Sequence, residues 1–228
     1  MARRLPIART AGQAGAPPGV QESQSDTERE ERLARVREQA RGCQACPLWQ
    51  TATQTVFGNG PASARLMFIG EAPGQTEDER GVPFVGRAGA LFDEALAAAG
   101  IPRDAVYVTN TVKHRPWLQV GRRQKNRPPK QSEINACRQW LTQELAIVQP
   151  RIIGCLGALA AKWVLGKDFR LTEQRGQWLS AEAAPHVLAT VHPSYVLIQP
   201  AESYERWRES FFADVRRIGE RFLVLAGE

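Results

Sequence analysis

Short apolar runs alternate with longer amphipathic stretches along most of this chain. The runs with strand character cover residues 66–69, 106–109, 152–156 and 187–191. Apolar positions with helical spacing fill the segments between them, and strands that alternate with helices are typical of a parallel sheet covered on both faces. The pattern therefore predicts an α/β fold, a three-layer α/β/α arrangement around a central parallel sheet of about four strands.

Three of the predicted helices have a continuous apolar face. The members of each face are spaced as one side of a helix requires. The faces are Leu91, Phe92 and Leu96 after Gly86; Ile134, Cys137, Leu141 and Leu145 before Pro150; and Trp207, Phe211, Val215, Ile218 and Phe222 in a last helix from about Ala201. We expect these faces to pack on the sheet as core rather than to bind a cofactor.

The N-terminal part of the chain has a different composition. Residues 1–26 are rich in Gly, Pro, Gln, Ser and Arg and lack periodic apolar positions, which predicts a disordered tail. Residues 27–41 are densely charged, with Leu33 and Val36 as the main apolar positions, and predict an exposed helix that leads to Cys43. We expect residues 27–228 to form a single domain.

Composition and charge narrow the class of protein. A hydrophobic content of 43% is enough for one sizeable core, and the net charge of +6 fits a nucleic-acid partner, although a basic enzyme without one could also have it. The start MARRLPIARTAG lacks the apolar segment of a signal peptide. No run nears the roughly 18 apolar residues of a membrane span. We expect a cytoplasmic monomer with no membrane partner.

The candidate chemistry lies at the ends of the predicted strands, where parallel sheets place their ligand crevice. The segments are GEAPG at 70–74, GVPFVG at 81–86, TN at 109–110 followed by VKHRP at 112–116, and HPSY at 192–195. Each segment alone is a weak signal, because turns, core aromatics and helix caps use the same residues.

Residues of the first three segments suit the recognition of a planar base. Glu71 can orient or activate a water molecule, and Gly74 lets the backbone approach a ligand closely. Phe84 can stack on a base, although a loop phenylalanine can equally fill the core. Asn110 offers a donor and an acceptor to a pyrimidine edge, although it could simply cap a turn.

The last segment adds a donor and an apolar wedge. His192, followed at a short distance by Ser194, can donate a hydrogen bond to a developing oxyanion. Tyr195, Val196 and Leu197 could wedge into a duplex. A His-Pro-Ser tripeptide by itself is more often a structural turn.

The four cysteines are too few for a disulfide scaffold, and in a reducing compartment they indicate a metal or catalytic role. Cys43-x-x-Cys46 is a close pair, whereas Cys137 and Cys155 lie far along the chain and do not form a second one. Four thiolates can bind zinc or a [4Fe–4S] cluster. Their spacing leaves both open, with four unrelated buried cysteines as the alternative.

Taken together and in this order, the segments GEAPG, PFVG, TNxVKxRP and HPS resemble those of the family 4 uracil-DNA glycosylases, over about residues 40–218. The resemblance implies a base excision repair enzyme that hydrolyses the N-glycosidic bond of uracil flipped out of single- or double-stranded DNA. It also implies a structural [4Fe–4S] cluster, rather than zinc, at the four cysteines.

The resemblance assigns roles to the residues of the four segments. Phe84 would stack on the flipped uracil, and Asn110 would read its pyrimidine edge. His192 would stabilise charge on the departing base. Glu71, with the backbone of Ala72, would line the pocket near the attacking water.

Residues 118–128 depart from the family pattern. Typical members pass almost directly to an Asn-Arg-x-Pro stretch, whereas here Arg122, Arg123 and Lys125 intervene in what we expect to be a loop that contacts phosphates, or is merely solvated. The loop resembles that of a branch that bonds covalently to the abasic sugar through a histidine, and Asn126 stands at the matching position. An amide cannot replace imidazole as a nucleophile, so we expect ordinary hydrolysis with Asn126 helping to position the water.

Three other functions remain open: a covalent uracil-DNA cross-linking enzyme, a non-catalytic iron–sulfur protein that binds damaged DNA, and a glycosylase of broader specificity. Glu71 and Asn110 disfavour the pure binder, which needs no water-placing carboxylate. Glu71 also favours uracil over other lesions, because family 5 relatives with wide pockets tend to lack a carboxylate in the first motif. His114 is expected to be non-catalytic.

Overall fold

The computed structural model describes residues 25–227. Most of the predicted N-terminal tail, residues 1–24, therefore lies outside the described residues. Ser25 caps helix α1 (Asp26–Arg41) in a reciprocal capping box with Glu28, so residues 25 and 26 belong to this helix rather than to the tail. Leu33 and Val36 of α1 are buried against α4, which makes the helix a packed element with one exposed face.

Five strands form the central sheet, in the order β2-β1-β5-β7-β6. The strands are β1 (Leu66–Gly70), β2 (Val106–Asn110), β5 (Ile152–Leu156), β6 (Trp178–Ala181) and β7 (Ala184–Thr190). All neighbours pair in parallel except β6, which is antiparallel to β7 at the edge. Every residue of β1, β2 and β5 is buried, as a parallel sheet covered on both faces requires. The four predicted strands are confirmed.

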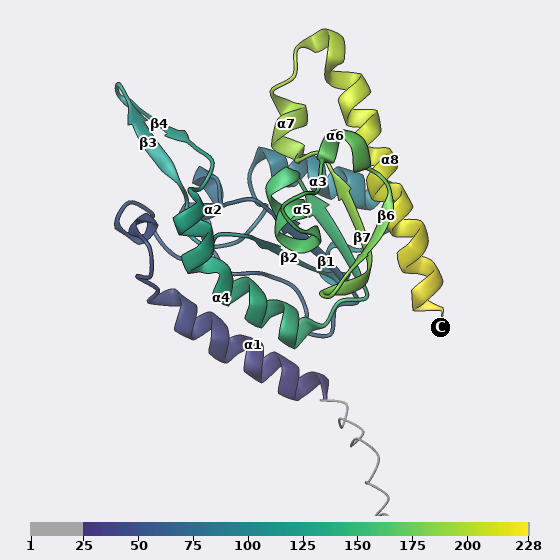
Figure 1. Cartoon of the computed structure of the whole chain (residues 1–228), viewed down its shortest axis with the longest axis horizontal. Coiled ribbons are helices and arrows are strands. Elements are labelled where there is room, and N and C mark those ends of the chain that lie inside the picture. The colour runs from purple at the N-terminus through teal and green to yellow at the C-terminus, as the bar shows by residue number, and fades with distance from the viewer. Residues whose placement is uncertain (1–24, 228) are drawn as a thin grey trace, which may run out of the picture.

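Helices cover both faces of the sheet (Figure 1). One face carries α1, α4 (Gln131–Val148) and α5 (Ala158–Leu165), and the other carries α3 (Arg87–Ala98), α7 (Pro193–Leu197) and α8 (Ala201–Ala226). Side chains of β1 alternate between the two layers: Met67 and Ile69 join the α4 side, while Leu66 and Phe68 join the α8 side. The predicted three-layer α/β/α arrangement is confirmed.

The three predicted helices with apolar faces are also confirmed. Helix α8 buries Phe211, Val215 and Ile218, with Trp207 and Phe222 partly buried beside them. Short elements complete the chain: η1 (Pro47–Gln50), α2 (Gln75–Arg80), η2 (Arg103–Ala105) and α6 (Leu171–Gln174). No helix within residues 25–227 is both long and apolar enough to cross a bilayer.

The predicted basic loop is a β-hairpin, and this corrects the sequence interpretation. Strands β3 (Trp117–Val120) and β4 (Arg123–Asn126) pair in antiparallel fashion and project away from the central sheet (Figure 1). The two-residue turn between them begins with Gly121 at φ 59°, a left-handed conformation that glycine adopts without steric cost. Because most side chains of the hairpin are exposed and polar, its strands carry no hydrophobic alternation that could have revealed them.

Candidate active site

A cavity of about 630 Å³ opens at the carboxyl ends of β1, β2 and β7. Its position follows the rule for open parallel sheets, in which ligands bind where the strand order reverses. Its lining includes most of the predicted site residues: Glu71, Ala72, Gly74, Phe84, Asn110, Asn126, His192, Ser194 and Tyr195. Segments far apart in the sequence therefore meet in one site, of a size suited to a small planar ligand.

Gly70, the last residue of β1, lies where Asn110 and Phe84 come together. A Cβ atom at this position would overlap Asn110 Oδ1 and would lie 2.6 Å from Phe84 Cζ. The Asn110 amide and the Phe84 ring therefore both occupy the space that a side chain at Gly70 would fill. Only glycine leaves room for this arrangement.

Asn110 lines the cavity and, among the described residues, has an acceptor atom that no other group uses. The residue is 2% exposed, and its Oδ1 is buried with no hydrogen-bond partner among the described residues. Buried polar atoms are almost always hydrogen-bonded, and an orphan at a cavity wall calls for an explanation. A ligand N–H at this wall would satisfy it.

Phe84 serves both the core and the cavity. Its backbone has φ 58°, an unusual conformation for an aromatic residue, and its ring packs 5.4 Å from the Phe92 ring. The same ring lies 5.8 Å from the His192 ring, across the cavity lining. Backbone strain of this kind is often found where a side chain must point into a site.

Glu77 holds two of the site loops together, and the sequence analysis missed it. This buried carboxylate accepts hydrogen bonds from Gly74 N–H at 3.1 Å, Val85 N–H at 3.0 Å and Gly86 N–H at 2.7 Å. It therefore ties the GEAPG turn to the PFVG loop and fixes Phe84 relative to Glu71. The spacing Gly74-x-x-Glu77 is that of a helix capping box and could have indicated it.

Glu71 is half-buried in the cavity, and its backbone is anchored. Its carbonyl oxygen accepts hydrogen bonds from Thr111 Oγ1 at 2.5 Å and from Val112 N–H at 3.3 Å. Burial raises the pKa of the Glu71 carboxyl above its usual range. The group is thus a carboxylate whose position is set by the end of β2.

His192 is a neutral imidazole whose tautomer is fixed by its neighbours. It caps α7, and its Nδ1 accepts a hydrogen bond from Ser194 N–H at 3.2 Å and lies 2.7 Å from Ser194 Oγ. Because a backbone N–H can only donate, Nδ1 carries no proton and Nε2 carries it instead. Burial lowers the pKa of His192 to about 4, so the ring is a neutral N–H donor near pH 7.

Asn126 is held by Arg115, a second residue that the sequence analysis did not single out. Arg115 is buried, and it donates from Nε to Asn126 Oδ1 at 2.7 Å and from a terminal nitrogen to Gln124 Oε1 at 2.9 Å. Since guanidinium has no acceptor, the Asn126 amide can only be oriented with its oxygen toward Arg115. Its NH₂ group therefore lies toward Gly74 and the first motif.

The predicted apolar wedge is only partly available. Val196 is fully buried in the core beneath α7 and Leu197 packs partly against it, so Val196 does not reach DNA in this arrangement. Tyr195 is exposed and packs edge-on against Trp207 at 5.1 Å. Ile198, which the sequence analysis missed, is 76% exposed and lines the cavity mouth. The exposed apolar tip is thus formed by Tyr195 and Ile198.

The basic residues Arg122, Arg123 and Lys125 are exposed on the projecting hairpin. The base of the hairpin is fixed by hydrogen bonds: Trp117 Nε1 donates to the Thr51 carbonyl at 2.9 Å, and Arg127 makes a two-bond ion pair with Glu133 of α4 at 2.6 and 2.8 Å. A bidentate pair of this kind adds geometric definition as well as energy. The charges therefore sit on an anchored element beside the cavity.

Three of the four cysteines share one neighbourhood. Burial raises the pKa of the Cys137 thiol to about 12, and the charges of Cys46 and Cys43 also contribute. Cys137 Sγ accepts from Lys113 N–H, and Cys43 Sγ accepts from Trp140 Nε1–H, both at 3.2 Å. Hydrogen bonds of this type to sulfur accompany iron–sulfur ligation and tune it.

Cys155 is buried in β5 on the same side of the sheet as the other three, and burial alone raises the pKa of its thiol. Within residues 25–227, no three His, Cys, Asp or Glu side chains lie close enough together to hold a single metal ion. The thiol donors have the soft chemistry that zinc and iron–sulfur clusters require. The membership of Cys155 in a ligand set stays a prediction.

His114 has a tautomer that its neighbours fix. It is buried and follows Lys113, whose N–H contacts Cys137. Its Nε2 lies 2.9 Å from Thr55 Oγ1, which itself donates to the Ala40 carbonyl, so Nε2 carries the proton and Nδ1 keeps its lone pair.

Comparison with known proteins assigns the class. Residues 57–216 match the family model of the uracil DNA glycosylase superfamily. The matched segment contains β1, β2, β5 and β7 and every cavity residue described above. The chain therefore belongs to this superfamily.

Curated relatives narrow the assignment to one branch. A type-4 uracil-DNA glycosylase of Thermotoga maritima is 41% identical over 74% of this chain and 85% of its own length. Those of Sulfurisphaera tokodaii and Archaeoglobus fulgidus are 36% and 37% identical, over 84% and 78% of this chain and 90% and 87% of their own lengths. Within the superfamily, the chain's branch is type 4.

Proposed function

We propose that this protein is a monofunctional uracil-DNA glycosylase of base excision repair, which acts as a monomer on uracil in single- or double-stranded DNA. The observation that carries the proposal is the buried, unpartnered Oδ1 of Asn110, next to the Phe84 ring and in the same cavity as a neutral His192. The names of the type-4 relatives support the choice of uracil as the substrate.

The cavity suits a base that has left the helix stack. A base must be flipped out before its glycosidic bond is accessible, and a pocket then reads its Watson–Crick edge. Uracil carries an N–H at position 3 that would donate to Asn110 Oδ1, while Phe84 contacts the ring face. Cytosine lacks this N–H and would leave the buried acceptor unsatisfied, which is how such a site rejects an analogue.

The departing base is stabilised by His192. As the glycosidic bond breaks, negative charge develops on uracil, and the Nε2–H of a neutral imidazole can donate to the carbonyl oxygen that receives this charge. A donor aimed at developing charge in a water-poor site contributes about 2.7–4 kcal/mol to barrier lowering in comparable cases. The Ser194 N–H bond to Nδ1 keeps the proton on Nε2 throughout.

Water attack is guided by Glu71 and Asn126. The carboxylate of Glu71 accepts a hydrogen bond from the water and orients it. The Asn126 oxygen is occupied by Arg115, so only its NH₂ group is free, and this group holds the water or a substrate oxygen as a donor. An amide in this state is not a nucleophile, so the product is a free abasic site rather than a protein–DNA adduct.

The cofactor we propose is a [4Fe–4S] cluster held by Cys43, Cys46, Cys137 and Cys155, with zinc as the alternative metal. Its role is structural: it ties the segment after α1 to α4. Four free cysteines suit a reducing compartment such as the cytoplasm. Iron content and visible absorption of the Cys155→Ala protein test the membership of Cys155 in the ligand set, because loss of a ligand lowers both quantities. Zinc in place of iron would contradict the proposal.

The function is tested by single-turnover excision from oligonucleotides that differ only in the target base. We expect release of uracil but not cytosine, and loss of uracil release in the Asn110→Ala variant by roughly 10²-fold or more. Removal of hypoxanthine at the rate of uracil would instead indicate a broad-specificity enzyme. Binding of the uracil strand with no base release would indicate a non-catalytic damage-binding protein.

A further inference from the structure

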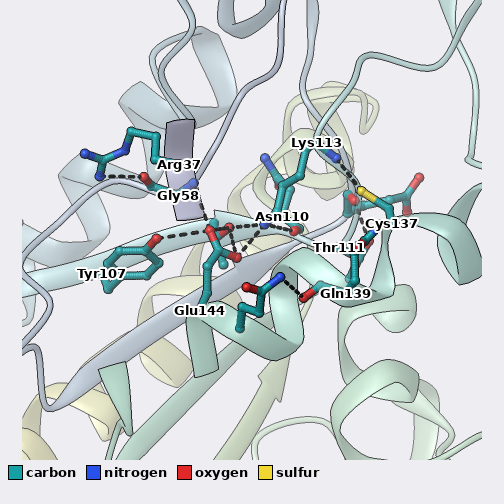
Figure 2. A network of polar contacts seen from close by, with 12 residues as sticks. Arg37, Gly58, Tyr107, Asn110, Thr111, Lys113, Cys137, Gln139 and Glu144 are labelled. Atoms are coloured by element: carbon teal, nitrogen blue, oxygen red, sulfur yellow. Dashed lines mark hydrogen bonds and ion pairs between the residues drawn. The ribbon is translucent and has the colours of Figure 1, made fainter. Parts of the chain in front are cut away.

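A fully buried ion pair lies directly behind Asn110. Lys113 and Glu144 are both 0% exposed, and their charged atoms are 2.5 Å apart. The ammonium of Lys113 donates to Glu144 Oε2, to Thr109 Oγ1 at 2.6 Å and to the Asn110 carbonyl at 2.8 Å (Figure 2). An ammonium has three N–H donors, and all of them are used.

Glu144 is equally well satisfied, and its partners come from separate segments. Its Oε1 accepts from Gly58 N–H at 2.9 Å and from the Tyr107 and Thr109 hydroxyls, each at 3.0 Å. The carboxylate of α4 thus holds β2 and the segment that precedes β1 in one network (Figure 2). A network with every member satisfied is a rigid support for whatever it contacts.

Lys113 also contacts α4 through its main chain. Its N–H donates to Cys137 Sγ, and Cys137 lies on the same face of α4 as Glu144, two turns earlier. The residue is therefore clamped to α4 at both its backbone and its side-chain end. Its ammonium in turn contacts the carbonyl of Asn110.

We propose that Lys113, supported by Glu144, is a positioning residue that sets the direction from which the Asn110 amide meets the base. The inference rests on the proposed function, in which Asn110 reads uracil. Asn110 Oδ1 has no hydrogen-bond partner among the described residues, so the direction of this side chain depends on its main chain and on its packing against Gly70. The ion pair fixes that main chain at its carbonyl.

A purely structural role is a poor explanation for this pair. A buried ion pair loses hydration on folding, and packed apolar residues of similar volume often stabilise a core as well or better. An apolar pair, however, could not donate a hydrogen bond to the Asn110 carbonyl. Because a displacement of about 1 Å in a site can lower a rate roughly 10²-fold, a fixed carbonyl has direct consequences for recognition.

The test removes the donor on Asn110 while keeping the network neutral and packed. Lys113→Met combined with Glu144→Gln leaves an amide that still accepts from Gly58 and Tyr107. The combined variant keeps the Lys113 N–H that contacts Cys137, so metal content should equal that of the parent. Ile147→Ala, a core change on α4 away from Asn110, is the control for general destabilisation. Lys113→Leu combined with Glu144→Gln, which also lacks the donor to Asn110, is the second variant if the first does not fold.

A double-mutant cycle with Asn110→Ala shows whether the ion pair acts on excision through Asn110. With Asn110 present, the combined variant should lower single-turnover excision of uracil by about 10²-fold. In the Asn110→Ala background the same change should alter the rate by no more than about 2-fold, because residues that act through one another are not additive. Equal losses in both backgrounds, or a loss of metal content, would overturn the proposal.

A measurement that does not depend on catalysis, the NMR signal of the Asn110 side-chain amide, tests this inference separately from the proposed function. The Asn110 side-chain amide resonances in the ligand-free protein should shift in the combined variant and not in Ile147→Ala. If the parent released no uracil, the proposed function would fail while this shift would still support the positioning role. Unchanged Asn110 resonances would contradict that role whatever the activity.

Discussion

Burial shifts two titratable side chains of the cavity, Glu71 and His192, toward their neutral forms. It raises the pKa of Glu71 and lowers that of His192 to about 4. His192 is therefore already in its working form near neutral pH, whereas Glu71 must lose its proton at a higher pH than a free carboxyl. We therefore expect the protonation of Glu71 to set the acid limit of activity.

The first prediction concerns this limit. Uracil excision should fall as pH drops through a midpoint above 4.5, the ordinary value for Glu71, with no inflection near 6.5, the ordinary value for histidine. Glu71→Gln should be slower by about 10²-fold and lose the acid limb, because its amide does not titrate. Single-turnover rates across the acid range measure both. An acid limb near 6.5 that persists in Glu71→Gln would assign the limit to another group.

The second prediction concerns Gly70. A methyl group there would overlap Asn110 Oδ1 and press on Phe84, so Gly70→Ala should lower uracil excision by roughly 10²-fold. The overpacking should also cost about 1–3 kcal/mol of stability. Gly42→Ala is the matched control, because a Cβ there meets nothing within 4 Å. Equal activity of the two variants would mean that Asn110 and Phe84 do not need their observed positions.

Sequence alone could identify the residues that we propose to contact the base, but not the residues that hold them in place. Glu71, Asn110 and His192 follow parallel strands, and the ends of such strands meet at one edge, so their convergence was predictable. Glu77 and Arg115 act across loops whose paths no periodic pattern specifies. Val196 was misassigned because consecutive residues of a short helix point to different sides.

At the scale of elements, β2, α4 and the hairpin form one unit behind and beside the cavity. The Lys113–Glu144 pair joins β2 to α4, and the Arg127–Glu133 pair joins the end of the hairpin to the first turn of α4. Long periodic helices and buried strands were predictable because their patterns are strong. The hairpin and β6 were not, since short, partly exposed strands carry little hydrophobic alternation.

The third prediction belongs to this unit. Lys113→Met alone should destabilise the protein by about 3–5 kcal/mol, because it leaves the Glu144 carboxylate buried without its partner. Adding Glu144→Gln should restore much of the loss. Urea unfolding of the two proteins measures the difference. Equal stability of the single and the combined variant would contradict a Glu144 side chain that depends on its partner Lys113.

At the scale of the whole molecule, the net charge is +6, and part of the positive charge is concentrated at one place on the surface. The projecting hairpin concentrates exposed basic residues next to the cavity, and the exposed Tyr195 and Ile198 flank the same opening. We expect the hairpin to follow the DNA backbone while the apolar tip occupies the space left by the flipped base.

The fourth prediction follows from this distribution of charge. Replacing Arg122, Arg123 and Lys125 by Ser should weaken binding to single-stranded DNA and reduce the slope of log K against log salt by up to about 2, at roughly 0.7 per phosphate contact. The rate of the bound complex should change little, because these residues do not touch the base.

The control is a second triple variant that loses the same number of positive charges away from the hairpin. Ser at Arg35, Lys167 and Arg216, which are exposed on or beside α1, α5 and α8, should leave the salt slope nearly unchanged. Fluorescence anisotropy with a labelled strand, titrated at several salt concentrations, compares the two triple variants. Equal slopes would show that only net charge matters and that the hairpin has no special contact.

The most direct measurement is the fate of a labelled uracil-containing strand after incubation with the purified protein. One half is treated with hot alkali, and the other is run on a denaturing protein gel. A hydrolytic glycosylase with Asn126 in its observed state should give alkali-labile cleavage and no shifted protein band. A denaturant-resistant band would contradict hydrolysis and reveal a covalent enzyme with a nucleophile other than Asn126. Neither signal, from protein with its metal site filled, would contradict uracil as the substrate.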